Sequence, residues 1–155
     1  MWTTKQPLPY RTRLIIGCGA NHSHLGQHLQ ADTLNVSVED APDLLGDICA
    51  DRPNPELMGR YRVLLCECLP FSVYGNGMLY QNLEFLRAPN SCIVFLSVPG
   101  PGMHALEKWG WAYDWQLQDV MTVADLPPQL GIDPDFAHHL QFVLKTSPFP
   151  SLLVR

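Results

Sequence analysis

The fold is decided by an apolar run that ends in a glycine turn, Leu14-Ile15-Ile16-Gly17-Cys18-Gly19-Ala20-Asn21. The branched apolar residues before Gly17 predict a short buried strand, and the closely spaced glycines predict a tight turn into a helix. Glycine adopts positive φ without strain and lets a ligand approach the backbone. Ligands of open α/β sheets bind beyond the carboxyl ends of the strands. The turn therefore predicts a nucleotide-type binding site, and a strand-to-helix turn without a ligand is the alternative.

Short apolar runs of strand length recur along the whole chain. They occupy residues 13–17, 33–38, 61–67, 92–98, 116–123 and 140–146. The third and fourth runs lack alternation of apolar and polar residues, which is typical of strands buried on both faces. Helices are expected between the runs, at residues 25–29, 54–60, 77–87 and 103–109. The helix at 77–87 places Leu79, Leu83 and Leu86 on one face.

The alternation of strands and helices predicts a single α/β domain, residues 1–155, with a doubly wound and mostly parallel sheet. Residues 1–12 are expected to form an extended N-terminal arm, and residues 148–155 an irregular tail, because prolines interrupt both segments. Only a loop broken by Pro127 and Pro128 joins the last two strand runs. We therefore expect these two strands to form an antiparallel C-terminal hairpin.

The charge and hydropathy of the chain limit its class of partner. The formal net charge is −5, with only 10 Lys and Arg, so no general attraction to phosphate backbones is expected. We therefore expect no nucleic-acid partner. The sequence lacks the roughly 20 consecutive apolar residues of a membrane span, and it lacks a signal peptide pattern. We expect no membrane association and a cytoplasmic location.

The cysteine and histidine patterns predict reduced thiols and no metal site. The five cysteines are an odd number, and most of them lie inside the apolar runs. Cys66 and Cys68 are spaced C-x-C without a second pair, which argues against zinc. His24 and His28 have the spacing of one helical face, but no third ligand accompanies them. Two interpretations stay open for these histidines: a polar, partly exposed loop, or a ligand contact or general base, for which His24 is the candidate.

Four segments, taken in order, resemble class I S-adenosylmethionine-dependent methyltransferases. They are Ile16-Gly17-Cys18-Gly19; Thr33-Leu34-Asn35-Val36 with Ala41-Pro42-Asp43-Leu44-Leu45-Gly46-Asp47-Ile48; residues 62–71; and residues 82–87 with 92–98. The resemblance covers roughly residues 13 to 147. It implies a Rossmann-like fold with strand order 3-2-1-4-5-7-6, in which the seventh strand is antiparallel. It also implies S-adenosylmethionine as the cofactor and methyl transfer as the reaction.

The same resemblance implies a set of cofactor-binding residues. They are Gly17, Cys18, Gly19, Asn35, Asp47, Ile48 and Glu67. The glycine turn would lie along the methionine and ribose parts of the cofactor. Asp47 and Ile48 would meet the adenine. Asn35 stands where the family has an acidic residue that binds both ribose hydroxyls, and an amide oxygen offers one acceptor there.

For catalysis, the resemblance points to the end of the fourth strand. Glu67 would lie near the amino acid end of the cofactor or near the substrate, and it is our first candidate for a general base. His24 is the next candidate, because imidazole titrates near neutral pH. The substrate is expected to be a small molecule or a protein. The sequence leaves open whether the chain forms a homodimer or uses a partner subunit to cover the site.

Three positions depart from the family's pattern and support competing hypotheses. Ile15 and Asn35 replace acidic residues, and Asn21 replaces a glycine. An amide lacks the charge-assisted hydrogen bond of a carboxylate. The main alternative is therefore a non-catalytic, methyltransferase-like binding or regulatory module with a degenerate cofactor site. A different nucleotide-binding enzyme is disfavoured, since both G-x-G-x-x-G and G-x-x-x-x-G-K-[ST] are absent from the sequence.

Overall fold

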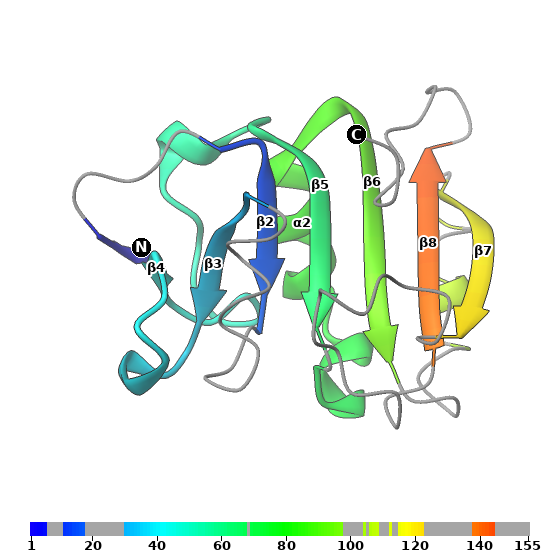
Figure 1. Cartoon of the computed structure of the whole chain (residues 1–155), viewed down its shortest axis with the longest axis horizontal. Coiled ribbons are helices and arrows are strands. Elements are labelled where there is room, and N and C mark those ends of the chain that lie inside the picture. The colour runs from blue at the N-terminus through cyan, green and yellow to red at the C-terminus, as the bar shows by residue number, and fades with distance from the viewer. Residues whose placement is uncertain are drawn as a thin grey trace.

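A computed structural model describes residues 1–5, 11–17, 30–67, 69–97, 104, 106–108, 112, 115–122 and 138–144. Within these residues, eight strands form one mixed sheet in the order β1-β4-β3-β2-β5-β6-β8-β7 (Figure 1). The strands are β1 (Thr3–Thr4), β2 (Arg13–Ile16), β3 (Asp32–Asn35), β4 (Leu44–Leu45), β5 (Tyr61–Glu67), β6 (Arg87–Ser97), β7 (Trp115–Thr122) and β8 (His138–Leu144). The helical segments are η2 (Val38–Asp40), η3 (Pro55–Leu57), η4 (Phe71–Gly75) and α2 (Gly77–Leu86).

The centre of the sheet is parallel, and its two edges are antiparallel. β4, β3, β2, β5 and β6 run in the same direction. β8 is antiparallel to both β6 and β7, and β1 is antiparallel to β4. Counted from β2, the strands follow the order 3-2-1-4-5-7-6, with β1 added at the edge. The predicted α/β class is confirmed, and the C-terminal strands pair as the antiparallel hairpin expected from the sequence.

The central strands explain the apolar runs of the sequence. Leu64, Leu65 and Cys66 of β5 are fully buried on both faces of the sheet, as are the consecutive residues Ile93 and Val94 of β6. Each fully buried aliphatic side chain of this size stabilises the fold by about 1.5–3 kcal/mol. Burial on both faces removes the need for polar residues at alternate positions.

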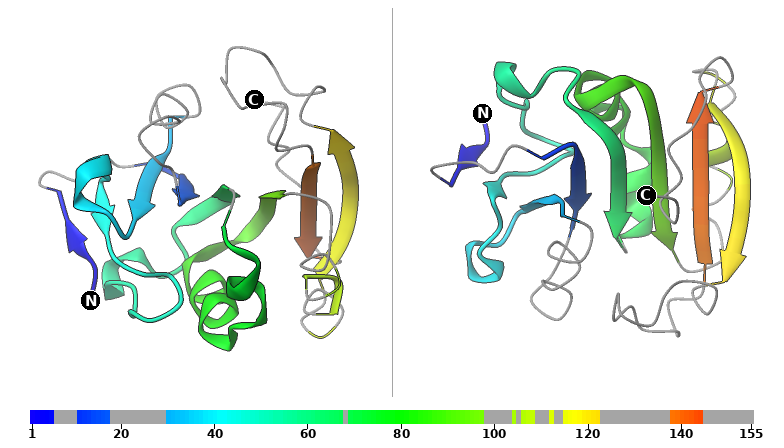
Figure 2. Two further views of the ribbon diagram at one scale, coloured as in Figure 1. Left: turned by 90° about the horizontal axis from the view of Figure 1, so that it is seen from below. Right: turned by 45° about the horizontal axis from the view of Figure 1, so that its top comes forward.

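Helix α2 packs against one face of the sheet beside β5, as Figure 1 and the left view of Figure 2 show. Its buried residues include Leu79, Leu83 and Leu86, so the predicted apolar face of this helix is confirmed. Asn76 caps the helix, since its side-chain oxygen accepts a hydrogen bond of 2.9 Å from the Met78 backbone N–H. Within the described residues, no helix is long and apolar enough to cross a membrane.

Two sequence predictions differ from the structure at the amino ends of β5 and β6. The helix expected at 54–60 is the short 3-10 segment η3, and the Asn54 side chain makes no capping hydrogen bond. Residues 88–91, between the helix expected at 77–87 and the strand expected at 92–98, belong to β6. Tyr61 pairs with Arg87 whereas Val63 pairs with Cys92, so the additional residues of β6 form a bulge between these pairs. Pairing with β5 thus overrides the local turn signal of Pro89 and Asn90.

The N-terminal residues form part of the sheet edge. Thr3 and Thr4 pair with Leu45 and Leu44 of β4. The indole of Trp2 is 3% exposed and belongs to the hydrophobic core. The expected irregular tail at 148–155 and the expected helix at 25–29 lie outside the described residues.

Candidate functional site

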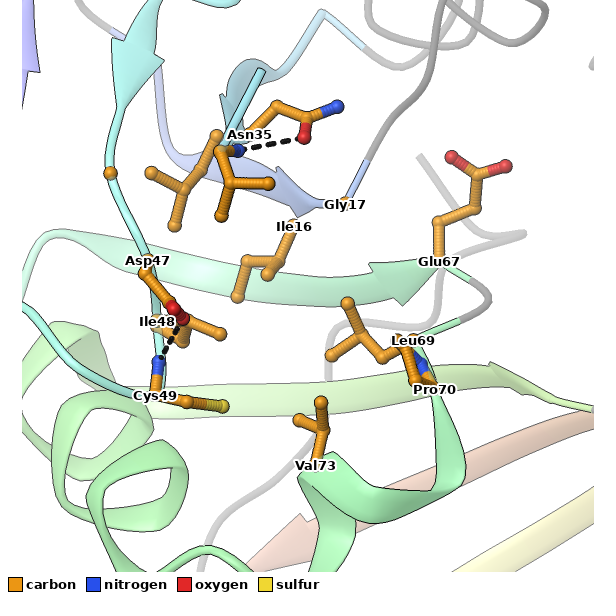
Figure 3. Close-up of a pocket in the computed structure, with 13 residues that line it drawn as sticks. Ile16, Gly17, Asn35, Asp47, Ile48, Cys49, Glu67, Leu69, Pro70 and Val73 are labelled. Carbon is orange, nitrogen blue, oxygen red and sulfur yellow. Dashed lines mark hydrogen bonds between the residues drawn. The ribbon is translucent and has the colours of Figure 1, made fainter.

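A pocket of about 310 Å³ opens at the carboxyl ends of the parallel strands β2, β3 and β5 (Figure 3). The segments that follow β3, β4 and β5 supply its walls. The lining residues are Ile16, Gly17, Leu34, Asn35, Val36, Gly46, Asp47, Ile48, Cys49, Glu67, Leu69, Pro70 and Val73. This is the edge of an open α/β sheet where ligands bind.

The pocket brings together several residues that the sequence analysis selected. Gly17, Asn35, Asp47, Ile48 and Glu67 all line it, although they come from four separate segments of the chain. The other selected positions, 18, 19 and 24, lie outside the described residues, as does position 21. The described part of the predicted site is therefore one contiguous surface.

Gly17 has a backbone conformation that favours glycine. Its φ is +85°, and its N–H donates a hydrogen bond of 2.8 Å to the Leu34 carbonyl oxygen on the neighbouring strand. A Cβ atom at this position would come within 2.8 Å of the Leu69 Cδ2 atom and 3.0 Å of the Glu67 carbonyl oxygen. The absence of a side chain therefore keeps the floor of the pocket open.

Asn35 directs its amide into its own loop. Its Oδ1 atom accepts hydrogen bonds from the backbone N–H of Val36 at 2.7 Å and of Ser37 at 3.3 Å. Its Nδ2 atom donates to Asp40 Oδ2 at 2.9 Å. Figure 3 shows the bond between Oδ1 and the neighbouring backbone N–H. The amide oxygen that was expected to accept a ribose hydroxyl already accepts bonds from the backbone.

The segment after β4 forms the opposite wall of the pocket. Asp47 Oδ1 accepts a hydrogen bond of 2.8 Å from the Cys49 N–H, and the Asp47 N–H donates to Asp51 Oδ2 at 2.9 Å. The Cys49 side chain lines the pocket beside Ile48 (Figure 3). Burial raises the pKa of the Cys49 thiol to about 11, and the nearby Asp47 charge adds to this shift. The thiol is therefore protonated at neutral pH and acts as a small apolar group.

The third wall surrounds the end of β5. Glu67, the last residue of this strand, is 3% exposed. Leu69 and Pro70 follow it, and Val73 of η4 completes an apolar surface next to the carboxylate. Sequence reasoning did not select these apolar residues as lining. Their only signal is that they directly follow the strand that ends in Glu67.

The described lining has acidic side chains and no basic one. Asp47 and Glu67 contribute carboxylates, and the described lining includes no Lys, Arg or His. Carboxylates favour a neutral or cationic ligand over a phosphate ester, which proteins bind with basic side chains or backbone N–H groups. Among the described residues, no group of three or more His, Cys, Asp or Glu is placed to hold a metal ion.

Comparison with known proteins gives matches in structure only. No protein-family model and no curated protein sequence matches this chain. The antibiotic-resistance methyltransferase Kmr superposes with a TM-score of 0.56 at 12% identity, over 88% of this chain and 87% of that one. The 16S rRNA (adenine(1408)-N(1))-methyltransferase from Catenulisporales acidiphilia, crystallised with the cosubstrate SAM, gives 0.58 at 12% identity over 94% and 91%.

The described chain has the class I methyltransferase-like fold. A TehB-like SAM-dependent methyltransferase from Corynebacterium glutamicum also superposes, with a TM-score of 0.56 at 14% identity over 89% of this chain and 82% of that one. The fold expected from the resemblance of the sequence is thus confirmed. The methyltransferase-like fold places the pocket at the strand ends that the sequence selected.

Proposed function

We propose that this protein binds S-adenosylmethionine in the pocket at the ends of β2, β3 and β5, and transfers its methyl group to a small molecule or a protein. The observation that carries this proposal is that the Gly17 backbone and the carboxylates of Asp47 and Glu67 line one pocket at the strand ends. S-adenosylmethionine has a sulfonium and an ammonium group, so carboxylates favour it. Dinucleotides and nucleoside triphosphates would place negatively charged phosphates beside the same carboxylates, and the repulsion disfavours them as ligands.

In the proposed complex, each wall of the pocket has its own task. Gly17 leaves room for the methionine and ribose parts, and Asp47 with Ile48 faces the adenine. Glu67 lies beside the amino acid end and the methyl acceptor. When bound, the cofactor supplies an activated methyl group. The protein aligns the acceptor with that group and excludes water, and the Glu67 carboxylate accepts a proton where the acceptor carries one.

The alternative of a non-catalytic module has one observation in its favour, the internal hydrogen bonds of Asn35. Because Asn35 Oδ1 accepts two backbone N–H bonds, the ribose hydroxyls lose the acceptor expected there. Such a module would bind the cofactor weakly and would not turn it over. Binding and turnover must therefore be measured separately.

Binding is tested by calorimetry with S-adenosylmethionine, S-adenosylhomocysteine, ATP and NAD. We expect micromolar binding of the first two and none of the phosphate-bearing ligands. The variants Gly17→Val and Asp47→Asn should abolish or strongly weaken binding. Glu56→Gln is the matched control, since this exposed residue lies in η3 before β5, away from the pocket. No binding of S-adenosylmethionine at millimolar concentration would refute the proposal.

Turnover is tested by following methyl label from S-adenosylmethionine into acceptors from a cell extract. Label in small molecules or protein supports the proposed substrate class. Label that nuclease treatment releases contradicts that class and points to nucleic acid. Binding without any transfer to these fractions favours the non-catalytic module.

A further inference from the structure

The wall of the pocket that carries Asp47 and Ile48 is a turn without regular secondary structure. It follows the two-residue strand β4, and the Gly46 N–H donates to the Asn35 carbonyl oxygen of β3 at 3.0 Å. The backbone hydrogen bonds after Gly46 are short-range. The N–H groups of Ala50 and Asp51 donate to the Asp47 carbonyl oxygen at 3.2 and 2.8 Å. These bonds define the shape of the turn. Its position against the sheet requires contacts with other elements.

Helix α2 provides one such contact through a buried amide. Asn82 is 4% exposed, and its Nδ2 atom donates to the carbonyl oxygens of Ile48 at 2.7 Å and Asp51 at 2.8 Å. Both protons of this amide nitrogen are therefore used on the same turn. Loss of the Asn82 amide would leave buried carbonyl oxygens without a hydrogen bond, which lowers the free energy of unfolding.

Trp2, directly before β1, provides the second contact through its aromatic ring. The indole of Trp2 lies so close to Gly46 that a Cβ atom there would be 2.7 Å from Trp2 Cγ and 2.8 Å from Trp2 Nε1. Gly46 lines the pocket directly before Asp47. The ring therefore limits how far this part of the wall can move toward it.

We infer that Asn82 and Trp2 are positioning residues, which act on the ligand through the Gly46–Asp51 turn without touching it. The inference rests on the proposed function, in which this turn faces the adenine. Asn82 lies 34 residues from Ile48 in the sequence, and Trp2 lies near the N-terminus of the chain. Neither residue lines the pocket among its described walls. Together, the contacts of Asn82 and Trp2 with the turn set the distance between the turn and β2.

The variant Asn82→Asp tests this inference with minimal change of shape. In this variant a carboxylate oxygen replaces the Asn82 amide nitrogen. Both donated hydrogen bonds are lost, and an acceptor faces the carbonyl oxygens of Ile48 and Asp51. We expect S-adenosylmethionine, S-adenosylhomocysteine and adenosine to bind about tenfold more weakly, by a similar factor for each, since the turn faces the part they share. Burial raises the pKa of the new carboxyl group, and its protonated form regains one donor. The loss should therefore become smaller as the pH is lowered.

A second variant and a control separate positioning from general destabilisation. Trp2→Phe, which removes part of the ring beside Gly46, should weaken the same three ligands. Leu86→Ala removes a fully buried side chain at the C-terminal end of α2, one turn beyond Asn82 and next to the residue that pairs with the start of β5. It should lower the melting temperature and leave the dissociation constants unchanged well below that temperature.

Hydrogen exchange reports the position of the turn without any ligand. The amides of Cys49, Ala50 and Asp51 should exchange faster in Asn82→Asp than in the wild type, and Leu86→Ala should not change them selectively. Faster exchange in a protein that binds neither cofactor nor adenosine would refute the proposed function but not the positioning of the turn. Unchanged exchange and unchanged binding in both Asn82→Asp and Trp2→Phe would overturn the inference while the proposed function stands.

Discussion

Replacement of Gly17 by alanine tests the link between the glycine turn and the pocket. The φ of +85° is unfavourable for alanine, which costs about 1–2 kcal/mol. The new methyl group would also be 2.8 Å from Leu69 Cδ2 and 3.0 Å from the Glu67 carbonyl oxygen. The Leu69 side chain is flexible and must move, and overpacking of this kind costs about 1–3 kcal/mol. Together these effects predict a loss of about 2–5 kcal/mol of unfolding free energy.

For a domain of 155 residues, such a loss lowers the melting temperature by roughly 10 °C. Leu69 lines the pocket, so its displacement should also weaken S-adenosylmethionine binding, by about tenfold or more. Thermal unfolding followed by circular dichroism and calorimetric titration measure the two effects. Gly75→Ala is the matched control, because a Cβ atom there meets nothing within 4 Å, and we expect a change within about 0.5 kcal/mol. Equal melting temperatures for the two variants would refute this reasoning.

Three further predictions concern the surroundings of the pocket and the opposite end of the sheet. Gly46→Ala should destabilise the fold by about 1–3 kcal/mol in thermal unfolding, since its Cβ atom overlaps the Trp2 ring, and a neutral effect would contradict that packing. Tyr61→Phe removes the 2.8 Å hydrogen bond that the Tyr61 hydroxyl donates to the buried Asp32 carboxylate, so we expect a loss of about 1.5–3 kcal/mol of unfolding free energy at neutral pH. Burial raises the pKa of Asp32, and this hydrogen bond lowers it in part. That loss should decrease as the pH falls through the raised pKa, because protonation removes the charge that this hydrogen bond stabilises, and a loss independent of pH would exclude this cause. Alkylation of Cys49 should be slow at neutral pH and should accelerate up to about pH 11, which mass spectrometry of the modified peptide can follow.

Local sequence signals were sufficient where one strand or helix determines the structure. The run before Gly17 and the uniformly apolar residues of β5 predicted the strand ends that surround the pocket, because burial on both faces leaves a clear pattern. The spacing of Leu79 and Leu83 likewise predicted the buried face of α2. Asp47 and Glu67 were selected through the family resemblance and not from a local pattern, and their roles in binding stay predictions.

The missed features depend on partners distant in the sequence. β1 consists of Thr3 and Thr4, which have no periodic pattern and become a strand only through pairing with β4. The polar residue Asn82 lies on the buried side of α2, but its sequence position does not identify the carbonyl groups that it binds. The internal bonds of Asn35 depend similarly on Asp40 in the following turn. Each case is decided by tertiary contacts rather than by local propensity.

The short strand β1 also affects how the sheet meets other molecules. An exposed edge of a β-sheet presents unpaired N–H and C=O groups that can template pairing with another chain. Here the edge beside β4 ends in a two-residue strand of threonines, which offers too few such groups for a stable intermolecular ladder. At high concentration this side of the protein should therefore resist edge-to-edge aggregation.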